Sequence, residues 1–438
     1  MNDKKFDQYI VSFFLYLLAS VILLGPYFTP FSVLGPRGIL RADQVLIPVL
    51  ATLIIIFYSD QFVIPNNLAV LAIASMVGII SLAIFTNTIL YRGTTDIGDL
   101  FDVIIWISYL ALIITVPGNI SIKQAKRTML LIIWLSIGVA LLGILQWYNV
   151  NVATEIIAPI YTARLDTVGR QPTATLLNPN SLGKLMLFPF FFSFAQLYRT
   201  YTVENLAQSV QKLVFWSALI TIPVVTVVFS NSRSALVGLL FGLTICILIV
   251  TLAQLGKRKK RIKFLTFIFL FGTFSLYLII DILEVGRFAN LQNPFQDSSL
   301  RTRFEIWERI FPVILERPLL GYGPSKSAQL EVGVPYIDSG YLSWWYRYGL
   351  IGLSALAAVV LAGIKTGINL VISKSVFNKS PVLWGTAIAA TGWFSGAIVF
   401  GGFNNVLQDR RIFTLALFII SLLISAQVKR IDLSKQQT

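Results

Sequence analysis

The chain has 438 residues, of which 56% are hydrophobic and only 13% are charged, about half of the ~25% that is usual for soluble domains. Its mean hydropathy is +0.77 and its formal net charge is +15. This composition excludes a soluble globular protein and a disordered chain, because both need many more charged residues in contact with water.

Twelve apolar segments approach the roughly 20 residues that a bilayer-spanning helix needs. The first follows Lys4 and Lys5 and has no small-residue cleavage site, so we expect it to be retained. The sequence therefore predicts an all-α polytopic membrane protein in which residues 1–438 form a single integral membrane domain with about 12 transmembrane helices. The predicted spans lie near 10–27, 43–57, 67–89, 99–116, 127–147, 181–198, 212–229, 234–254, 262–280, 339–363, 381–403 and 411–428.

The distribution of charge predicts the side of the membrane on which each loop lies. An even number of spans puts both termini on one side, and the positive-inside rule makes that side the cytoplasm. The run Gly256–Lys263 (GKRKKRIK) fixes the sidedness in the middle of the chain. We interpret this run as a topology signal and not as a nucleic-acid site, because its loop is only a few residues long.

Lysine and arginine are distributed differently between the two sides. Fourteen of the 16 lysines lie in predicted inner segments, whereas 14 of the 19 arginines lie in outer ones. Arginine grips phosphate or carboxylate with two hydrogen bonds, so the outer arginines indicate a polar recognition surface. Structural arginine–carboxylate pairs that rigidify the outer loops are the alternative.

Three predicted spans begin with capping side chains on the outer side. These motifs are Leu177–Ser181, with Lys184 one turn further on, Ser230–Ser234, which contains Arg233, and Asp338–Leu342. The free N–H groups at a helix N-terminus favour an anion. Arg233 is the sharpest case, since a cation between two apolar spans is costly without a partner. It is interpreted as a diphosphate ligand, or alternatively as a snorkelling or carboxylate-paired arginine.

The longest outer segment, 281–338, is predicted to be one large extracytoplasmic loop with short amphipathic helices. Ser298 or Ser299 can cap a helix that Arg317-Pro318 ends. Such a helix could lie on the membrane surface or pack over the bundle. The turn Gly321–Pro324 then allows the backbone to approach a ligand closely. The predicted apolar face of the helix consists of Phe304, Trp307, Phe311, Ile314 and Leu315.

Aromatic residues cluster where the tenth predicted span begins. They could stack on sugar rings, or they could form an aromatic belt at the membrane interface. The cluster consists of Tyr341, Trp344, Trp345, Tyr346 and Tyr348.

The absence of histidine excludes histidine general bases and histidine-ligated metals. The single cysteine, Cys246, excludes an intramolecular disulfide, and nothing in the sequence supplies a clear metal site.

Taken in order, these motifs resemble the O-antigen ligase / oligosaccharide repeat-unit polymerase superfamily, which contains Wzy-type polymerases and lipopolysaccharide O-antigen ligases. The stronger matches cover about residues 175–355. The matching features are Leu40–Asp43, Asn178–Ser181, Ser232–Ala235, the loop series Arg301, Trp307, Arg317-Pro318 and Gly321–Gly323, and Asp338–Leu342 followed by Tyr348–Gly352.

The resemblance implies a metal-independent, inverting glycosyl transfer at the outer side of the cytoplasmic (inner) membrane, without a cofactor or nucleic acid. The donor is an oligosaccharide on a polyprenyl (undecaprenyl) diphosphate, and a chain-length regulator and a flippase are conceivable partners. Ligases of this family typically have His-Asn where this chain has Asp338-Ser339, so the sequence favours a polysaccharide polymerase over an O-antigen ligase that uses lipid A core.

The resemblance and the local chemistry assign roles to individual residues. Arg233 is the main diphosphate ligand, and Asp338 is the general base or orienting acceptor for the incoming hydroxyl, or else a helix cap. Glu305 is the reserve base. The remaining expected substrate or diphosphate contacts are Arg41, Asn178, Asn180, Lys184, Arg301, Arg303, Arg317, Tyr322 and Tyr341, and no residue is assigned to a metal.

A transporter or flippase of lipid-linked glycans is the alternative from a different functional class. It would be expected to carry ionisable residues near the middle of the membrane. The predicted spans are nearly free of charge and the polar residues gather at one face, which favours chemistry at the surface.

Overall fold

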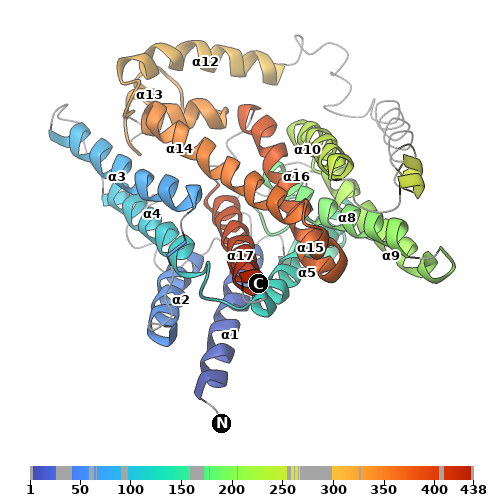
Figure 1. The fold of residues 1–438 in the computed structure, drawn as a ribbon. Helices are drawn as coiled ribbons and strands as arrows, with labels where there is room; N and C mark the ends of the chain where they lie inside the picture. The colour runs from blue at the N-terminus through green and yellow to red at the C-terminus, as the bar shows by residue number, and fades with distance from the viewer. Residues whose placement is uncertain are drawn as a thin grey trace. The chain divides into compact units, whose positions relative to one another are not determined.

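The computed structural model describes residues 3–25, 42–58, 64–65, 67–89, 97–157, 172–176, 178–204, 206–253, 258–260, 262–264, 266, 298–324, 327–403 and 409–435. All regular elements in these ranges are helices (Figure 1). They are α1 (Asp3–Leu24), α2 (Ala42–Tyr58), α3 (Leu68–Ile89), α4 (Ile97–Thr115), α5 (Ile122–Trp147), the π-helix η3 (Val152–Ile157), α7 (Pro179–Leu185), α8 (Leu187–Val203), α9 (Leu206–Phe229), α10 (Arg233–Leu252), α12 (Ser298–Glu316), α13 (Ser327–Glu331), α14 (Gly340–Val371), α15 (Lys374–Lys379), α16 (Pro381–Phe403) and α17 (Arg410–Lys435).

Eight helices of the described chain are long and apolar enough to cross a membrane, as expected for a multi-pass membrane protein. They are α1, α3, α5, α9, α10, α14, α16 and α17. Two other expected spans form the shorter apolar helices α2 and α4. The span expected at 181–198 is divided at Met186 between α7 and α8, and most of the span expected at 262–280 lies outside the described residues.

The chain forms two compact units, each built from segments that are distant in sequence. Unit 1 contains residues 1–135, 306–366 and 401–438. Here α4 lies beside α2 and α3 (Figure 1), and the buried helix α17 packs on α4 and α1. The Ser425 hydroxyl of α17 donates to the Val116 carbonyl at 3.1 Å, so even a buried serine in this unit has an acceptor.

Unit 2 contains residues 136–305 and 367–400, with the almost fully buried helix α8 at its core. Two pairs of glycines let α10 and α16 touch. They form a Gly-x-x-x-Gly sequence in each helix, at Gly238 and Gly242 and at Gly392 and Gly396. A Cβ on Gly396 would lie 2.8 Å from the Gly238 carbonyl oxygen, which leaves no room for a side chain. Small residues at such positions let membrane helices approach at backbone distance.

Helix α14 is interrupted at Gly349, whose φ of 65° and ψ of −172° belong to a region that is open essentially only to glycine. The N–H groups of Leu350 and Ile351 therefore turn away from their own helix. The Leu350 N–H donates to the Pro318 carbonyl at 2.8 Å. The Ile351 N–H donates to the Leu319 carbonyl at 3.4 Å. The Pro318 and Leu319 carbonyls, just after α12, thus replace the carbonyls of α14 that would accept from these N–H groups in a continuous helix.

The carbonyl groups on the other side of the interruption are paired in the same way. In a continuous helix, those of Tyr346 and Arg347 would accept from the two N–H groups just described. Here the Tyr346 carbonyl accepts from the Tyr322 N–H at 2.8 Å, and the Arg347 carbonyl accepts from the Gly323 N–H at 2.7 Å. The exchange pairs these four groups of α14 and fixes the 318–323 segment against this helix.

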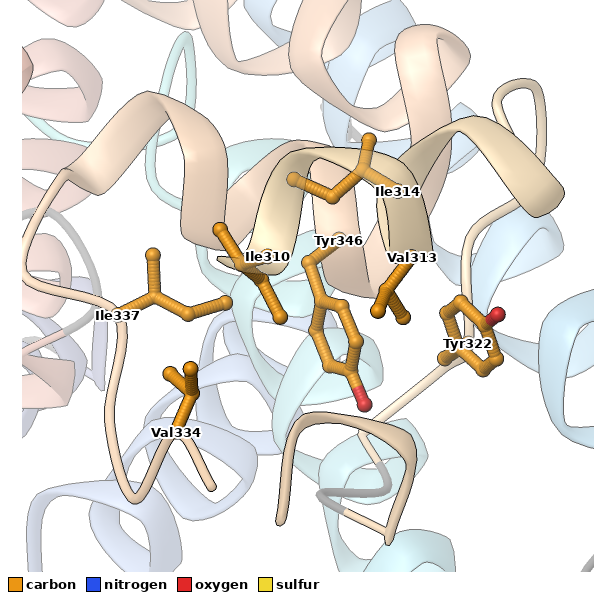
Figure 2. Packing of buried hydrophobic residues seen from close by; sticks show 7 residues of the cluster. All are labelled: Ile310, Val313, Ile314, Tyr322, Val334, Ile337 and Tyr346. Carbon is orange, nitrogen blue, oxygen red and sulfur yellow. The ribbon is translucent and has the colours of Figure 1, made fainter. Parts of the chain in front are cut away.

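A hydrophobic cluster covers this junction, with the Tyr346 ring at its centre (Figure 2). Tyr346 is fully buried, and its hydroxyl accepts from the Gln329 N–H at 3.2 Å. The other buried members of the cluster are Ile310, Val313, Ile314, Tyr322, Val334 and Ile337.

Helix α12 begins at Ser298 and ends just before Arg317, as the sequence predicts. The five residues of its predicted apolar face differ in exposure. Phe304, Phe311 and Leu315 are exposed, whereas the buried face is formed by Ile310, Val313 and Ile314. The helix has two apolar sides, and only packing against the rest of the chain selects the one that is buried.

Replacing Gly349 by alanine should destabilise the protein by about 2–4 kcal/mol, because the new methyl group would enforce a disfavoured backbone conformation and collide with the Leu319 backbone. Gly78→Ala in α3 is the matched control, because no atom lies within 4 Å of its added methyl group. The measurement is thermal unfolding of both variants in detergent. Equal midpoints for the two variants would contradict this account of the α14 interruption.

Candidate functional site

The Asn178 motif forms the predicted helix start in unit 2. The Asn178 side chain accepts from the Asn180 N–H at 2.8 Å and caps α7, whose first residue is Pro179. Both residues are therefore used in the capping turn, which is the local role that the sequence offers for an asparagine before proline. The side chain of Asn178 is exposed at this end of the helix.

The Arg233 motif also forms the predicted tight turn and helix start. Asn231 adopts a positive φ of 50°, and the Ser232 hydroxyl accepts from the Ala235 N–H at 3.4 Å to cap α10. Arg233 is the first residue of this helix and is half-buried. Its cationic side chain thus belongs to the end of α10 at which unpaired N–H groups already favour an anion.

The two motifs meet inside unit 2. A Cβ on Gly183 of α7 would lie 2.7 Å from the Ser230 hydroxyl oxygen and 3.0 Å from the Ser232 Cβ. This close approach is possible only because residue 183 has no side chain. The structure therefore brings the segment from Asn178 to Lys184 into direct contact with the turn that carries Arg233.

Lys184 is buried, and the sequence alone does not reveal this. Its side chain has no exposed surface, and its Nζ lies 4.9 Å from the centre of the Phe400 ring. Its backbone carbonyl accepts from the Trp393 indole N–H at 2.9 Å. Burying an ammonium group is expensive, and a cation–π contact offsets part of that cost. The Lys184 side chain is thus enclosed in unit 2, within the helix that Asn178 caps.

The arginines in the first half of α12 are more open. Arg301 pairs with Glu305 at 3.2 Å, with side-chain exposures of 79% and 52%. An exposed pair at i,i+4 contributes little to stability, about 0.3–0.5 kcal/mol. The contact nevertheless occupies the Glu305 carboxylate, which is the predicted reserve base. Arg303 is half-buried on the same stretch of helix.

Arg317 and Tyr322 form a second local cluster, in unit 1. The Arg317 guanidinium lies 4.3 Å from the centre of the Tyr322 ring, and that ring stacks on Tyr346 with centroids 5.1 Å apart. The Tyr322 hydroxyl donates to Glu316 at 2.6 Å. Burial raises the pKa of the Tyr322 phenol, and the bond to Glu316 raises it further. Tyr322 is therefore a neutral donor near pH 7, and not a base.

The motif before α14 divides its roles between neighbouring residues. The Ser339 hydroxyl accepts from the Leu342 N–H at 3.4 Å, so Ser339 provides a cap of the kind considered for Asp338. Asp338 is half-buried one residue earlier. The ring of Tyr341 lies against Gly401, where a Cβ would be 3.1 Å from the Tyr341 Cζ.

The predicted site residues are thus divided between the two units. Unit 2 brings together Asn178, Asn180, Lys184 and Arg233, and it also holds Arg301, Arg303 and Glu305. Unit 1 brings Arg317 and Tyr322 together, and it also holds Asp338 and Tyr341. Arg41 lies outside the described residues.

Unit 1 also contains a small pocket of about 40 Å³ that the sequence did not reveal. An ion pair between Asp102 of α4 and Arg410 of α17, 2.6 Å long, forms part of its wall. A charged residue just inside an apolar helix was the available signal. Nothing in the sequence indicated that residues 308 positions apart would meet. The remaining lining residues are Ile105, Trp106, Tyr109, Trp344, Arg347, Tyr348 and Phe413.

Gly183→Ala should destabilise the protein by about 1–3 kcal/mol, because the methyl group would push the Ser230 turn away from α7. A double-mutant cycle with Ser230→Ala tests the contact directly, since that change removes the nearest atom. Part of the loss should be recovered in the double variant relative to the sum of the single changes. If the changes in unfolding free energy of the two single variants simply add in the double variant, residues 183 and 230 are not in contact.

Comparison with protein families identifies one domain in this chain. The family model for O-antigen ligase (Wzy_C) matches residues 217–357, from within α9 to within α14. The matched stretch contains the turn at Arg233, helix α12, the Gly321–Gly323 turn and the motif at Asp338. A comparison with curated proteins found no match. The O-antigen ligase domain at residues 217–357 places the chain in the O-antigen ligase/polymerase superfamily.

Proposed function

We propose that this chain is a polysaccharide repeat-unit polymerase. It transfers a glycan from a polyprenyl diphosphate carrier to a sugar hydroxyl of another lipid-linked repeat unit, at the outer face of the cytoplasmic membrane. The family domain supports the general class, which is a membrane-embedded ligase or polymerase of lipid-linked glycans. The finer assignment depends on the residues described below.

The observation that carries the proposal is the junction of α7 and α10 in unit 2. There Arg233 begins a helix that contacts a second capped helix start, and that second helix carries the buried Lys184. A helix N-terminus and a guanidinium fork together favour a diphosphate. Such preorganised charge stabilises the leaving group more in the transition state than in the ground state.

The proposed step is a single displacement. The acceptor hydroxyl oxygen forms a bond to the anomeric carbon while the bond from that carbon to the diphosphate oxygen breaks. The polyprenyl diphosphate leaves with the electron pair, and its developing charge is assigned to Arg233. The hydroxyl proton passes to Asp338, which this proposal makes the general base. One displacement inverts the configuration at the anomeric carbon, and the step uses no metal.

The choice of polymerase over ligase depends on the residues before α14. The chain has Asp338-Ser339 at the position where the resemblance predicts His-Asn in a ligase, and it contains no histidine at all. The outer sidedness depends on the lysine-rich inner segments and the arginine-rich outer ones. Both arguments come from the sequence, and the acceptor is what the assay below must identify.

Arg233→Lys should lose glycan transfer by a factor of about 10²–10³ while the protein still inserts and folds, since lysine keeps the charge but loses the guanidinium fork. The assay is a gel of glycan products made by purified protein from lipid-diphosphate-linked repeat units of its own cells. Arg258→Lys is the matched control, because Arg258 is an exposed arginine of the basic run and should tolerate the change.

The pattern of bands tests the proposal itself. A ladder of increasing length with the wild-type protein, absent with Arg233→Lys, is the expected result. A single shifted band that requires lipid A core would identify a ligase instead. Transport of the lipid-linked glycan across vesicles without any new glycosidic bond would favour the transporter class. A full ladder with Arg233→Lys would remove this arginine from the diphosphate site.

Asp338→Asn and Ser339→Ala should separate chemistry from helix capping. Asp338→Asn keeps the shape of the side chain but removes its basicity, so turnover should fall strongly with little change in unfolding temperature. Ser339→Ala removes the hydroxyl that accepts from Leu342, so it should cost about 1 kcal/mol of stability and preserve most turnover. Unchanged turnover in Asp338→Asn would exclude this carboxylate as the base.

A further inference from the structure

The pocket lined by Asp102, Arg347 and Arg410 lies where three helices of unit 1 begin. Arg410 is the first residue of α17, and Asp102 and Arg347 lie within about two turns of the starts of α4 and α14. The cap and base candidates Ser339 and Asp338 are close in sequence to α14 but do not line the pocket. It is therefore a separate concave site on the unit that carries them.

Two charged groups of this pocket have hydrogen-bonding capacity to spare. Oδ1 of Asp102 accepts from Arg410 at 2.6 Å, and the carboxylate makes no other hydrogen bond in the described part of the chain. The guanidinium of Arg347 forms no hydrogen bond or ion pair with any residue that the structure describes. The pocket thus offers one acceptor and one cationic donor that the fold itself does not use.

A third polar group is the indole N–H of Trp344. Trp344 is 2% exposed, and its Nε1 is buried without an acceptor among the residues described. A buried donor without a partner costs about 1–3 kcal/mol, so such groups are rare in native proteins. Neighbouring Trp345 has no such deficit, because its indole N–H donates to the Pro318 carbonyl at 3.0 Å.

Aromatic rings hold these polar groups in place. The Trp106 ring makes edge contacts with Tyr109, Trp344, Tyr348 and Phe413, with centroid separations of 5.3–6.2 Å. Trp106 and Trp344 are both buried. Trp344 thus acts neither as an interfacial belt residue nor as an open stacking platform, the two roles that the sequence suggested. It can offer its N–H but not its ring face.

The pattern of spare groups selects the chemistry of the ligand. A sugar hydroxyl both donates and accepts, so two adjacent hydroxyls can donate to Asp102 and accept from Arg347 and Trp344. A phosphate or carboxylate would only accept, and it would face the Asp102 carboxylate. A volume of about 40 Å³ admits the hydroxyl-bearing edge of a sugar and not the whole ring.

We propose that this pocket is a saccharide subsite that holds a pair of adjacent hydroxyls on one sugar of the glycan. The proposal rests on the proposed function for its substrate class, because it deepens the account of how a lipid-linked glycan is held. It assigns a recognition role to Asp102, Trp344 and Arg347, three residues of unit 1 that lie outside the diphosphate assignment.

The test is direct binding of the sugar without its lipid. The probe is the oligosaccharide released by mild acid from lipid-linked repeat units of the producing cells, titrated calorimetrically into purified protein in detergent. Trp344→Phe removes the N–H and keeps an aromatic ring, and Arg347→Gln removes the guanidinium and keeps a polar chain. Each should weaken binding about five- to tenfold.

Matched controls separate recognition from folding. Trp384→Phe removes an indole N–H that donates to the Val371 carbonyl at 3.2 Å in unit 2, so it should lower stability and leave sugar affinity unchanged. Arg309→Gln changes an exposed arginine of α12 that lies outside the pocket, and it should also bind as the wild type does. Trp344→Phe, in contrast, should lose affinity without the cost of a broken hydrogen bond.

The possible outcomes distinguish this proposal from the polymerase assignment. Wild-type affinity in both Trp344→Phe and Arg347→Gln would overturn the subsite. A glycan ladder from a wild-type protein that does not bind the released oligosaccharide would also overturn it and leave the polymerase standing. Binding that these two variants weaken, in a protein that forms no glycosidic bond, would support the subsite and count against the polymerase.

Discussion

Lipid offers no hydrogen bonds, so a chain inside it must pair its own backbone N–H and carbonyl groups. Helices satisfy that requirement everywhere except at their ends, and several of the predicted site residues lie at those ends. Asn178, Ser232 and Ser339 each cap a helix start with a side-chain oxygen. The interruption at Gly349 obeys the same constraint, because the 318–323 segment takes up the backbone groups that α14 releases.

Features that depend on local chemistry could be predicted from the sequence. Hydropathy predicts the long apolar helices, because span length and apolar composition are local properties of the sequence. Eight helices of the described chain are long and apolar enough to cross a membrane. Capping residues gave the starts of α7, α10 and α14, and Arg317-Pro318 gave the end of α12. The family resemblance is confirmed by the O-antigen ligase domain, whose match contains Arg233 and Asp338.

Features that depend on tertiary packing could not be predicted. Lys184 reads as a surface cation one turn into a helix, and only the packing of Phe400 and Trp393 shows that it is buried. Both sides of α12 are apolar, so its period alone could not show that Ile310 and Val313 are buried while Phe304 and Phe311 are exposed. The Asp102–Arg410 pair joins residues from opposite halves of the chain, and no local sequence pattern predicts that they lie close together.

The contact between α10 and α16 has a consequence for how substitutions act in unit 2. Arg233 begins the helix that Gly238 and Gly242 hold against Gly392 and Gly396, and these backbones already touch. Every other amino acid is larger than glycine, so random mutation at these four positions can only push the helices apart. The direction in which α10 presents its first residue thus depends on the absence of side chains at these four positions. Mutational scanning of unit 2 should therefore find that its smallest residues tolerate substitution least.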